Sequence, residues 1–306
     1  MMESTPQYRG RFAPSPTGPL HFGSLVAAMG SYLEARSREG QWLVRMEDID
    51  PPREVAGSAD SILHSLEHLG MHWDGAVLYQ SRRYDAYDQA LAELERAGHT
   101  YPCSCSRTEI LKHAVVTGDG PIYPGTCRLG VNKQRLSYAL RVRVSDGPVE
   151  FKDHIQGRIR RHLKQDVGDF VLRRADGLPA YQLAVVVDDA MQGISHVVRG
   201  CDLFSASLRQ IYLQSLLGLA HPHYFHLPIV VNDKGEKLSK QTFAAPLDEN
   251  RPVLELVRAW GFLGQDLPVL FEAASVSEFW AWAVPRWQLS GVPRQRQIPL
   301  SGLAGC

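Results

Sequence analysis

Three cysteines lie close together in a glycine-rich segment of the 306-residue chain. Cys103 and Cys105 are separated by one residue, and Cys127 ends the sequence Tyr-Pro-Gly-Thr-Cys. Three thiols in such a segment indicate a structural zinc site, which needs a fourth ligand to complete a tetrahedron. On chemistry alone an imidazole is the favourite, a carboxylate also fits, and a phenolate is rare. The imidazole and carboxylate candidates are His99, His113 and Asp119. Three free, buried cysteines are the alternative.

A lysine-rich loop follows an apolar segment at residues 223–231. It contains Lys234, Lys237 and Lys240 together with a glycine, so it is cationic and flexible. Such a loop can close on a triphosphate and neutralise the charge that develops on pyrophosphate. For this motif taken alone, an ordinary solvated surface loop is the alternative.

The turn over residues 13–19 leads from a predicted strand into a predicted helix and is a candidate anion site. Unpaired N–H groups and the positive end of the helix dipole gather at a helix N-terminus. His21 in the first turn could donate to a phosphate, and Gly23 would let a flat ring approach the backbone. The spacing matches neither the dinucleotide-binding fingerprint nor the P-loop. A helix start capped by a histidine is the alternative.

Two charged residues lie at the carboxyl ends of predicted strands. In open α/β sheets that end faces the ligand crevice. Glu47 could therefore meet an ammonium group, and the forked guanidinium of Arg199 suits a carboxylate. The alternatives are an acidic loop around Glu47 and a structural salt bridge from Arg199 to Asp189 or Asp202.

The elements that must position these residues alternate between strands and helices. Residues 8–12 predict a strand, about 20–38 a helix, and 41–48 a second strand. This order predicts a βαβ unit with parallel strands. Helices are also expected over 58–70 and 85–97, because apolar residues recur there at helical spacing.

The second half of the chain is more varied. Residues 99–130 indicate a small irregular subdomain, and residues 138–144 alternate as a half-exposed strand. Strands are expected over 194–200 and 223–231. After residue 250 there is room for two or three helices.

The composition is that of an ordinary globular protein, with 44% apolar and 22% charged residues and no net charge. It argues against a wholly basic nucleic-acid binder. Residues 131–176 nevertheless hold eleven Lys and Arg against six Asp and Glu, which fits either a solvated face or an RNA-facing surface. There is no apolar run of membrane-spanning length, no signal peptide at the start, and only five cysteines. We therefore expect a cytoplasmic protein.

The turn and the lysine loop together resemble the two signatures of the class I aminoacyl-tRNA synthetases. The first signature, His-Ile-Gly-His, corresponds to His-Phe-Gly-Ser at residues 21–24. The segment at residues 11–21 resembles the glutamyl and glutaminyl branch specifically. The second signature, Lys-Met-Ser-Lys-Ser, corresponds to Lys-Leu-Ser-Lys-Gln at residues 237–241. The sequence departs from these signatures at Phe22, Ser24, Leu238 and Gln241.

This resemblance implies an α/β fold of the class I synthetase type, a Rossmann fold with a parallel sheet. The two halves of the catalytic domain are expected at residues 7–98 and 181–245. An inserted acceptor-type, zinc-binding and connective subdomain is expected at 99–180, and a short helical C-terminal part at 246–306. A full-length glutamyl enzyme continues with a helical anticodon-binding region. Only 65 residues follow Gln241 here, so we expect no anticodon-binding domain.

The resemblance also implies roles for individual residues. The implied glutamate site comprises Arg11, Phe12, Ala13, Pro14, Ser15, Glu47, Tyr181 and Arg199. The implied ATP site comprises His21, Gly23, Ser24, Lys237, Leu238, Ser239 and Lys240. The candidates for catalysis are His21, Lys237 and Lys240. Two arginines in the pocket favour glutamate over glutamine. By resemblance to a group with a Tyr-x-x-x-Cys pattern, one structural zinc ion is expected on Cys103, Cys105, Tyr123 and Cys127.

The chain resembles a short paralogue of glutamyl-tRNA synthetase. That resemblance implies activation of L-glutamate with ATP and Mg²⁺ in the absence of tRNA, and transfer of the glutamate to queuosine in the anticodon of tRNA(Asp). We expect a monomer without a membrane partner. Three alternatives stay open: a truncated glutamyl-tRNA synthetase that charges the terminal adenosine, a small-molecule nucleotidylyltransferase, and a non-catalytic RNA-binding relic.

Overall fold

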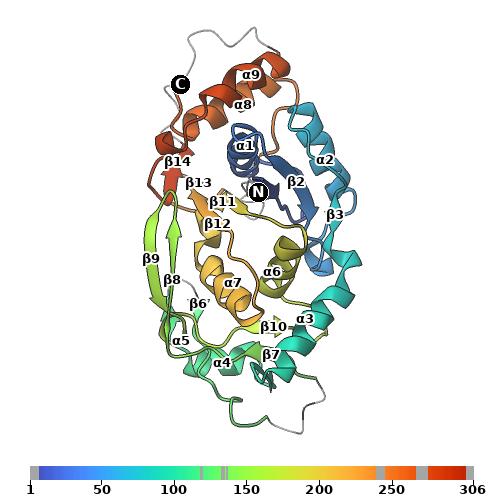
Figure 1. Ribbon diagram of the computed structural model, residues 1–306, viewed down its shortest axis with the longest axis vertical. Helices are drawn as coiled ribbons and strands as arrows, with labels where there is room; N and C mark the ends of the chain where they lie inside the picture. The colour runs from blue at the N-terminus through green and yellow to red at the C-terminus, as the bar shows by residue number, and fades with distance from the viewer. Residues whose placement is uncertain are drawn as a thin grey trace, which may run out of the picture.

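The computed structural model describes residues 7–117, 120–131, 135, 137–238, 245–266 and 275–300. In these residues, parallel strands near the centre of the molecule are covered by helices (Figure 1). The helices are α1 (Phe22–Arg36), α2 (Ser58–His68), α3 (Tyr84–Arg96), α4 (Arg107–His113), α5 (Leu163–Asp166), α6 (Tyr181–Met191), α7 (Phe204–Leu216), α8 (Pro252–Phe262) and α9 (Val276–Ala283). Short 3-10 helices are Pro51–Arg53, Gln80–Arg82, Cys201–Leu203, Val284–Arg286 and Leu289–Gly291.

The strands form a parallel central arrangement with antiparallel additions. The order β1-β2-β3 and the order β11-β12-β8 are parallel, and β9 runs antiparallel to β8. Ser195 donates its N–H to the carbonyl of Arg9 at 3.0 Å, which joins β11 to β1. The strands are β1 (Arg9–Phe12), β2 (Gln41–Met46), β3 (Leu78–Tyr79), β8 (Pro148–Asp153), β9 (Gly157–His162), β11 (His196–Gly200) and β12 (His223–Leu227). The predicted βαβ unit and parallel sheet are confirmed.

Helix α1 packs at the centre of the largest apolar core. It contacts β1, β2, β11 and α8, and its predicted apolar face is buried. The members of that face are Leu25, Ala28, Met29, Tyr32 and Leu33. The C-terminal segment closes this core, because the indole N–H of Trp287 donates to Glu34 of α1 at 2.7 Å.

A second group of strands lies within residues 99–180, where the sequence predicts an inserted subdomain. β4 (Thr100–Cys103), β7 (Ala139–Val142) and β10 (Val171–Arg173) pair antiparallel with β7 in the middle. The short pair β5 (Val116–Thr117) and β6 (Gly120–Pro121) lies in the same part of the chain. The expectation of an irregular subdomain over 99–130 is therefore only partly right. This segment contains β4 and helix α4, and α4 begins with a capping box formed by Ser106 and Glu109.

A strand forms within residues 138–144, but the prediction that it is half-exposed is wrong. Leu140, Arg141 and Val142 are all buried, because β7 is the central strand of its sheet. Arg141 tolerates this position because its guanidinium lies 3.9 Å from the ring centre of Tyr123 and donates to the carbonyl of Asp169.

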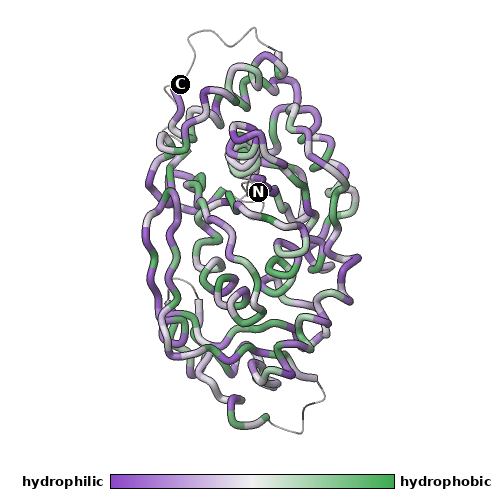
Figure 2. The backbone as a smooth tube through the Cα atoms, viewed as in Figure 1, coloured by the Kyte–Doolittle hydropathy of each residue, from purple (hydrophilic) through white to green (hydrophobic). Residues whose placement is uncertain are grey.

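The expected single strand over 223–231 is two strands. Pro228 separates β12 from β13 (Ile229–Val231), because proline has no N–H to continue a ladder. β13 pairs in parallel with β14 (Gln297–Pro299), so the C-terminal part adds a strand as well as helices. Figure 2 shows β9 as largely hydrophilic, in keeping with its place at the outer edge of a sheet. None of the helices in the described ranges has both the length and the apolar character needed to span a membrane.

Candidate active site

A cavity of about 670 Å³ opens at the carboxyl ends of the central strands. Arg11 and Phe12 end β1, Glu47 follows β2, and Arg199 lies near the end of β11. This is the edge at which an open α/β sheet is expected to bind ligands. The described members of both predicted sets line this one cavity: Arg11, Phe12, Ala13, Pro14, Ser15, His21, Gly23, Ser24, Glu47, Tyr181, Arg199, Lys237 and Leu238. The structure brings the two sets together, and the role of each residue stays a prediction.

Arg11 is held at the floor of the cavity by a carboxylate of α6. Its Nε and Nη2 donate to Oδ1 and Oδ2 of Asp189 at 3.1 and 3.3 Å, and Nη1 of Arg45 donates to Oδ1 at 2.7 Å. The three side chains are at most 5% exposed. Burial alone would raise the pKa of Asp189, but the two guanidinium groups hold it below its ordinary value. Asp189 is therefore ionised and fixes both arginines.

Glu47 lies beside Arg45, and the nearby positive charges offset the cost of burying its carboxylate only in part. Burial raises its pKa, and the charges of Arg45 and Arg11 oppose the shift without cancelling it. Nη2 of Arg45 is 3.4 Å from Oε1 of Glu47. Burial also raises the pKa of Tyr181 to about 12, and the charge of Glu47 adds to that rise. A desolvated carboxylate gains from a nearby cation, so Glu47 is suited to an ammonium group.

Arg199 is tied to neighbouring polar groups through two of its three nitrogens. Nε donates to Nε2 of His226 at 3.3 Å, and Nη2 donates to Ser207 at 2.7 Å and to Gln210 at 2.8 Å. Nη1 is buried and has no hydrogen-bond partner among the described residues. Arg199 lines the cavity, and its guanidinium therefore still lacks an acceptor for one nitrogen within the described part of the chain, a need that a ligand carboxylate can meet.

The helix start at the other end of the cavity is capped by a histidine. Nδ1 of His21 accepts the N–H of Ser24 at 3.2 Å, so the proton of a neutral ring lies on Nε2. A Cβ at Gly23 would lie 3.2 Å from the His21 ring and 3.5 Å from the carbonyl of Leu238. A side chain at this position would therefore crowd the His21 ring, whereas its distance to the lysine loop would be an ordinary contact.

The described part of the lysine loop lines the cavity beside the helix start. Nζ of Lys237 is 2.5 Å from Oδ2 of Asp202, and both residues line the cavity. A phosphate bound here must compete with Asp202 for this lysine. The other predicted members of the loop, Ser239 and Lys240, lie outside the described residues.

The cysteine cluster converges as the sequence predicted. The Sγ atoms of Cys103, Cys105 and Cys127 all lie within 4.8 Å of one another. The hydroxyl of Tyr123 is 3.3 Å from Sγ of Cys103 and 3.5 Å from Sγ of Cys105. Neither candidate histidine joins this group in the described part of the chain, and Asp119 lies outside it. The buried three-cysteine cluster could bind a metal ion.

Several residues of the site were not found from the sequence. Arg45 is a charged residue inside an apolar strand, and His226 interrupts an apolar run in the same way. Both features are signals of a buried polar contact. Asp153 and Ser207, which contact His226, and Gln210, which contacts Arg199, carry no such signal.

Comparison with known proteins supports the class I synthetase family and fold over most of the chain. The family model described as tRNA synthetases class I (E and Q), catalytic domain, matches residues 7–267. A glutamate-tRNA synthetase from Elizabethkingia anophelis shares the fold, with a TM-score of 0.79 at 24% identity, over 97% of this chain and 69% of that one.

Two curated relatives match almost end to end. The glutamyl-Q tRNA(Asp) synthetase of Dechloromonas aromatica (strain RCB) is 57% identical over 296 residues, which is 96% of this chain and 98% of that protein. The protein of the same name from Aromatoleum aromaticum (strain DSM 19018 / LMG 30748 / EbN1) is 51% identical, over 98% of this chain and 95% of that protein. The chain therefore belongs to the class I tRNA synthetases of the E and Q branch and, within them, to the glutamyl-Q tRNA(Asp) synthetase family.

Proposed function

We propose that this protein activates L-glutamate with ATP, without tRNA, and transfers the glutamyl group to queuosine in the anticodon of tRNA(Asp). The observation that carries the proposal is the single cavity in which the glutamate and nucleotide sets meet. The names of the relatives supply the acceptor. In this proposal the catalytic domain comprises residues 7–98 and 181–245, with the insertion at 99–180 and the C-terminal part at 246–306.

Glutamate would be bound through its positive α-ammonium group and its negative side-chain carboxylate. Glu47 would take the α-ammonium group, because its buried carboxylate needs a cation. Nη1 of Arg199 would take the side-chain carboxylate, with Tyr181 beside it. A neutral amide would leave this nitrogen without an anionic partner, so glutamine is the poorer substrate.

ATP would be held between the helix start and the lysine loop. The glutamate α-carboxylate attacks the α-phosphorus in line, the bond to pyrophosphate breaks, and glutamyl adenylate forms. Positioning and charge stabilisation suffice for this step, so no covalent enzyme intermediate is needed. Nε2–H of His21 would donate to a phosphate oxygen, while Lys237 and Lys240 would neutralise the leaving pyrophosphate. Mg²⁺ would enter with the nucleotide.

One zinc ion would be held by Cys103, Cys105, Tyr123 and Cys127. With Zn–S at about 2.3 Å and Zn–O at about 2.0 Å, a tetrahedral site separates sulfur and oxygen by about 3.5 Å. The two sulfur–oxygen distances of 3.3 and 3.5 Å fit this geometry. The ion would fix the fold of the insertion and take no part in the chemistry.

The zinc proposal predicts one zinc per purified chain. Cys127→Ser should lose the metal and loosen the insertion, because folding of such a subdomain is coupled to binding. Metal analysis of Tyr123→Phe and His113→Ala identifies the fourth ligand. Zinc retained in the first variant and lost in the second would assign the position to His113.

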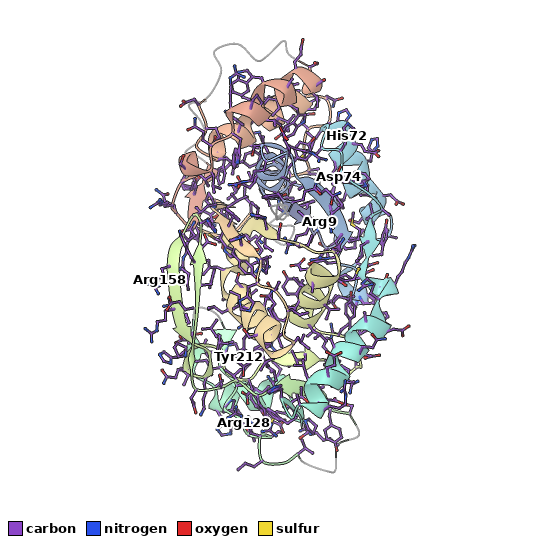
Figure 3. The ribbon with its side chains drawn as sticks, viewed as in Figure 1. Arg9, His72, Asp74, Arg128, Arg158 and Tyr212 are labelled. Carbon is purple, nitrogen blue, oxygen red and sulfur yellow. The ribbon has the colours of Figure 1, made fainter. Side chains whose placement is uncertain are left out.

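The RNA would lie against the basic edge of the β8–β9 hairpin. Arg158, Arg160 and Arg161 are exposed on β9, and Arg158 projects from the outer side of the hairpin (Figure 3). Phosphate contacts of this kind position an RNA but do not select a base, so queuosine would be selected in the cavity. We propose that the protein acts as a cytoplasmic monomer.

The test has two stages. Exchange of pyrophosphate into ATP should require glutamate and no tRNA. Transfer of glutamate should then require tRNA(Asp) that carries queuosine, with the label on the modified base. Exchange that appears only when tRNA is added contradicts tRNA-independent activation. Label on the terminal adenosine favours the truncated glutamyl-tRNA synthetase instead.

A further inference from the structure

A buried chain of polar side chains leads from the end of β8 to Arg199 in the cavity. Nδ1 of His226 lies 2.6 Å from Oδ2 of Asp153, and Nε2 of the same ring lies 3.3 Å from Nε of Arg199. Asp153 is 1% exposed and His226 is 0% exposed. Burying these polar groups is unfavourable unless each contact is made, so their arrangement is strongly specified.

The direction of the contact between Asp153 and His226 is fixed by charge. Burial alone would raise the pKa of Asp153, but the hydrogen bonds from His226 and from backbone N–H groups bring it below its ordinary value. Burial lowers the pKa of His226 to about 4, so the ring is neutral at neutral pH. An ionised carboxylate can only accept, so the single ring proton lies on Nδ1.

This tautomer leaves the lone pair of His226 Nε2 facing Arg199. Nε–H of Arg199 donates to it, and so does the hydroxyl of Ser207 at 2.9 Å. Ser207 and Gln210 in turn accept from Nη2 of Arg199. Acceptors therefore hold two of the guanidinium nitrogens, and Nη1 is the one without an acceptor among the described residues.

We propose that Asp153 and His226 are positioning residues for glutamate. By fixing the His226 tautomer, they hold the Arg199 guanidinium with Nη1 available to the side-chain carboxylate of the substrate. This inference rests on the proposed glutamate site. With the proton on Nε2 instead, two donors would face each other and the guanidinium would be displaced. Asp153 belongs to β8 of the insertion, so this segment would help to set amino-acid specificity.

A merely structural role predicts something different. Loss of the network would then lower the free energy of unfolding and leave the affinity for glutamate in the folded protein unchanged. The two roles separate when KM for glutamate and KM for ATP are measured beside unfolding.

Two substitutions at the histidine form a matched pair. In His226→Gln the side-chain carbonyl can replace Nε2 as the acceptor for Arg199. In His226→Asn the amide reaches only the Nδ1 position, so it keeps the contact with Asp153 and loses the acceptor. We expect KM for glutamate to rise about tenfold or more in His226→Asn, and less in His226→Gln, because a buried donor loses its acceptor only in the former. KM for ATP should change little in either variant.

Asp153→Asn reverses the tautomer without changing size. Oδ1 of Asp153 accepts the backbone N–H groups of Ile155 and Gln156 at 2.9 and 2.7 Å. An asparagine must keep its carbonyl there, so its NH₂ faces Nδ1 of His226 and moves the ring proton to Nε2. We expect higher KM for glutamate and weaker discrimination against glutamine. Glutamine at position 226 has no tautomer, so the same substitution should have a smaller effect in the His226→Gln background.

The measurements are glutamate-dependent pyrophosphate exchange and calorimetric binding of glutamate to the full chain, with thermal unfolding as the check on folding. Equal glutamate affinity in His226→Asn, Asp153→Asn and the wild type overturns the inference and leaves the proposed function standing. A wild type that binds glutamate without exchange removes the proposed function, and the binding constants still test the positioning. A wild type that binds no glutamate removes both.

Discussion

The two ends of the cavity hold their charges in opposite ways. At the amino-acid end, Arg11, Arg45 and Glu47 are at most 8% exposed, and each is fixed by a charged partner. At the nucleotide end, the side chain of Lys237 is 46% exposed and that of its partner, Asp202, is 29% exposed. Burial strengthens the ion pairs at the amino-acid end and fixes their side chains. Exposure weakens the pair at the nucleotide end, so Lys237 can exchange partners. In the proposed reaction, the rigid amino-acid end recognises glutamate. The lysine at the nucleotide end can change partners as charge develops on pyrophosphate.

Breaking the buried pairs should have the largest effect. In Asp189→Asn, Arg11 and Arg45 lose the charge that they share, so we expect the free energy of unfolding to fall by about 3–5 kcal/mol. Denaturant unfolding measures this loss. Asp176→Asn is the control, because Asp176 forms an exposed ion pair with Arg174 and should lose less than about 1 kcal/mol. Equal losses in the two variants would remove the contrast between buried and exposed charges.

Removing the signature lysine should impair the reaction and spare the fold. We expect Lys240→Ala to lower glutamate-dependent exchange about a hundredfold, since one charge that stabilises the transition state is lost. Unfolding should stay as in the wild type. Lys234→Ala removes a lysine of the same loop outside the signature and should have a much smaller effect. Equal effects would assign the function to the net charge of the loop.

The sequence signals for the nucleotide end and the amino-acid end differ in kind, and the role of each residue at either end stays a prediction. A loop such as residues 237–241 is recognisable because its motif is continuous in the chain. The sheet and the family were also predicted correctly, since βαβ patterning and both signatures are local. The network around Arg199 was missed, because His226 and Asp153 are separated by 73 positions and meet only through the pairing of β12 with β8.

The wrong prediction of burial around Arg141 has the same cause as the missed network around Arg199. The expected half-exposed strand around Arg141 followed from an alternating pattern that does not show whether a strand is central or at an edge. Its neighbours in the fold, Tyr123 and Asp169, provide the contacts that make a buried arginine acceptable. Partners far apart in the sequence thus decide which charges can be buried.

Glutamate binding should weaken as the pH falls, because a proton competes with the ammonium group at Glu47. The pKa of Glu47 lies above its ordinary value of 4.5, so the loss should begin at a higher pH than for an exposed glutamate. In Glu47→Gln, KM for glutamate should be higher and independent of pH in that window. The pH profile of exchange is the measurement, and identical profiles for the variant and the wild type would contradict this role.

The same group has a defined effect on stability. The folded chain retains the Glu47 proton to higher pH than the unfolded chain, so its contribution to the free energy of unfolding falls as pH rises from 4.5 toward the folded-state pKa. Asp189 has the opposite sign, because its pKa is lowered in the folded chain. Its contribution is present above the ordinary value of 3.8 and is lost as pH falls through the folded-state pKa.

Removing the charge of Asp202 beside Lys237 should have the smallest effect of all. In Asp202→Asn the free energy of unfolding should change by less than about 1 kcal/mol, because the pair is exposed and screened by water. Lys237 no longer has to leave the Asp202 carboxylate before it meets a phosphate, so we expect KM for ATP to fall about two- to threefold at low salt. This difference should shrink as ionic strength rises, since salt already weakens the competing pair. KM for ATP at two salt concentrations is the measurement. A large loss of stability in this variant would show that the nucleotide end is held as rigidly as the amino-acid end.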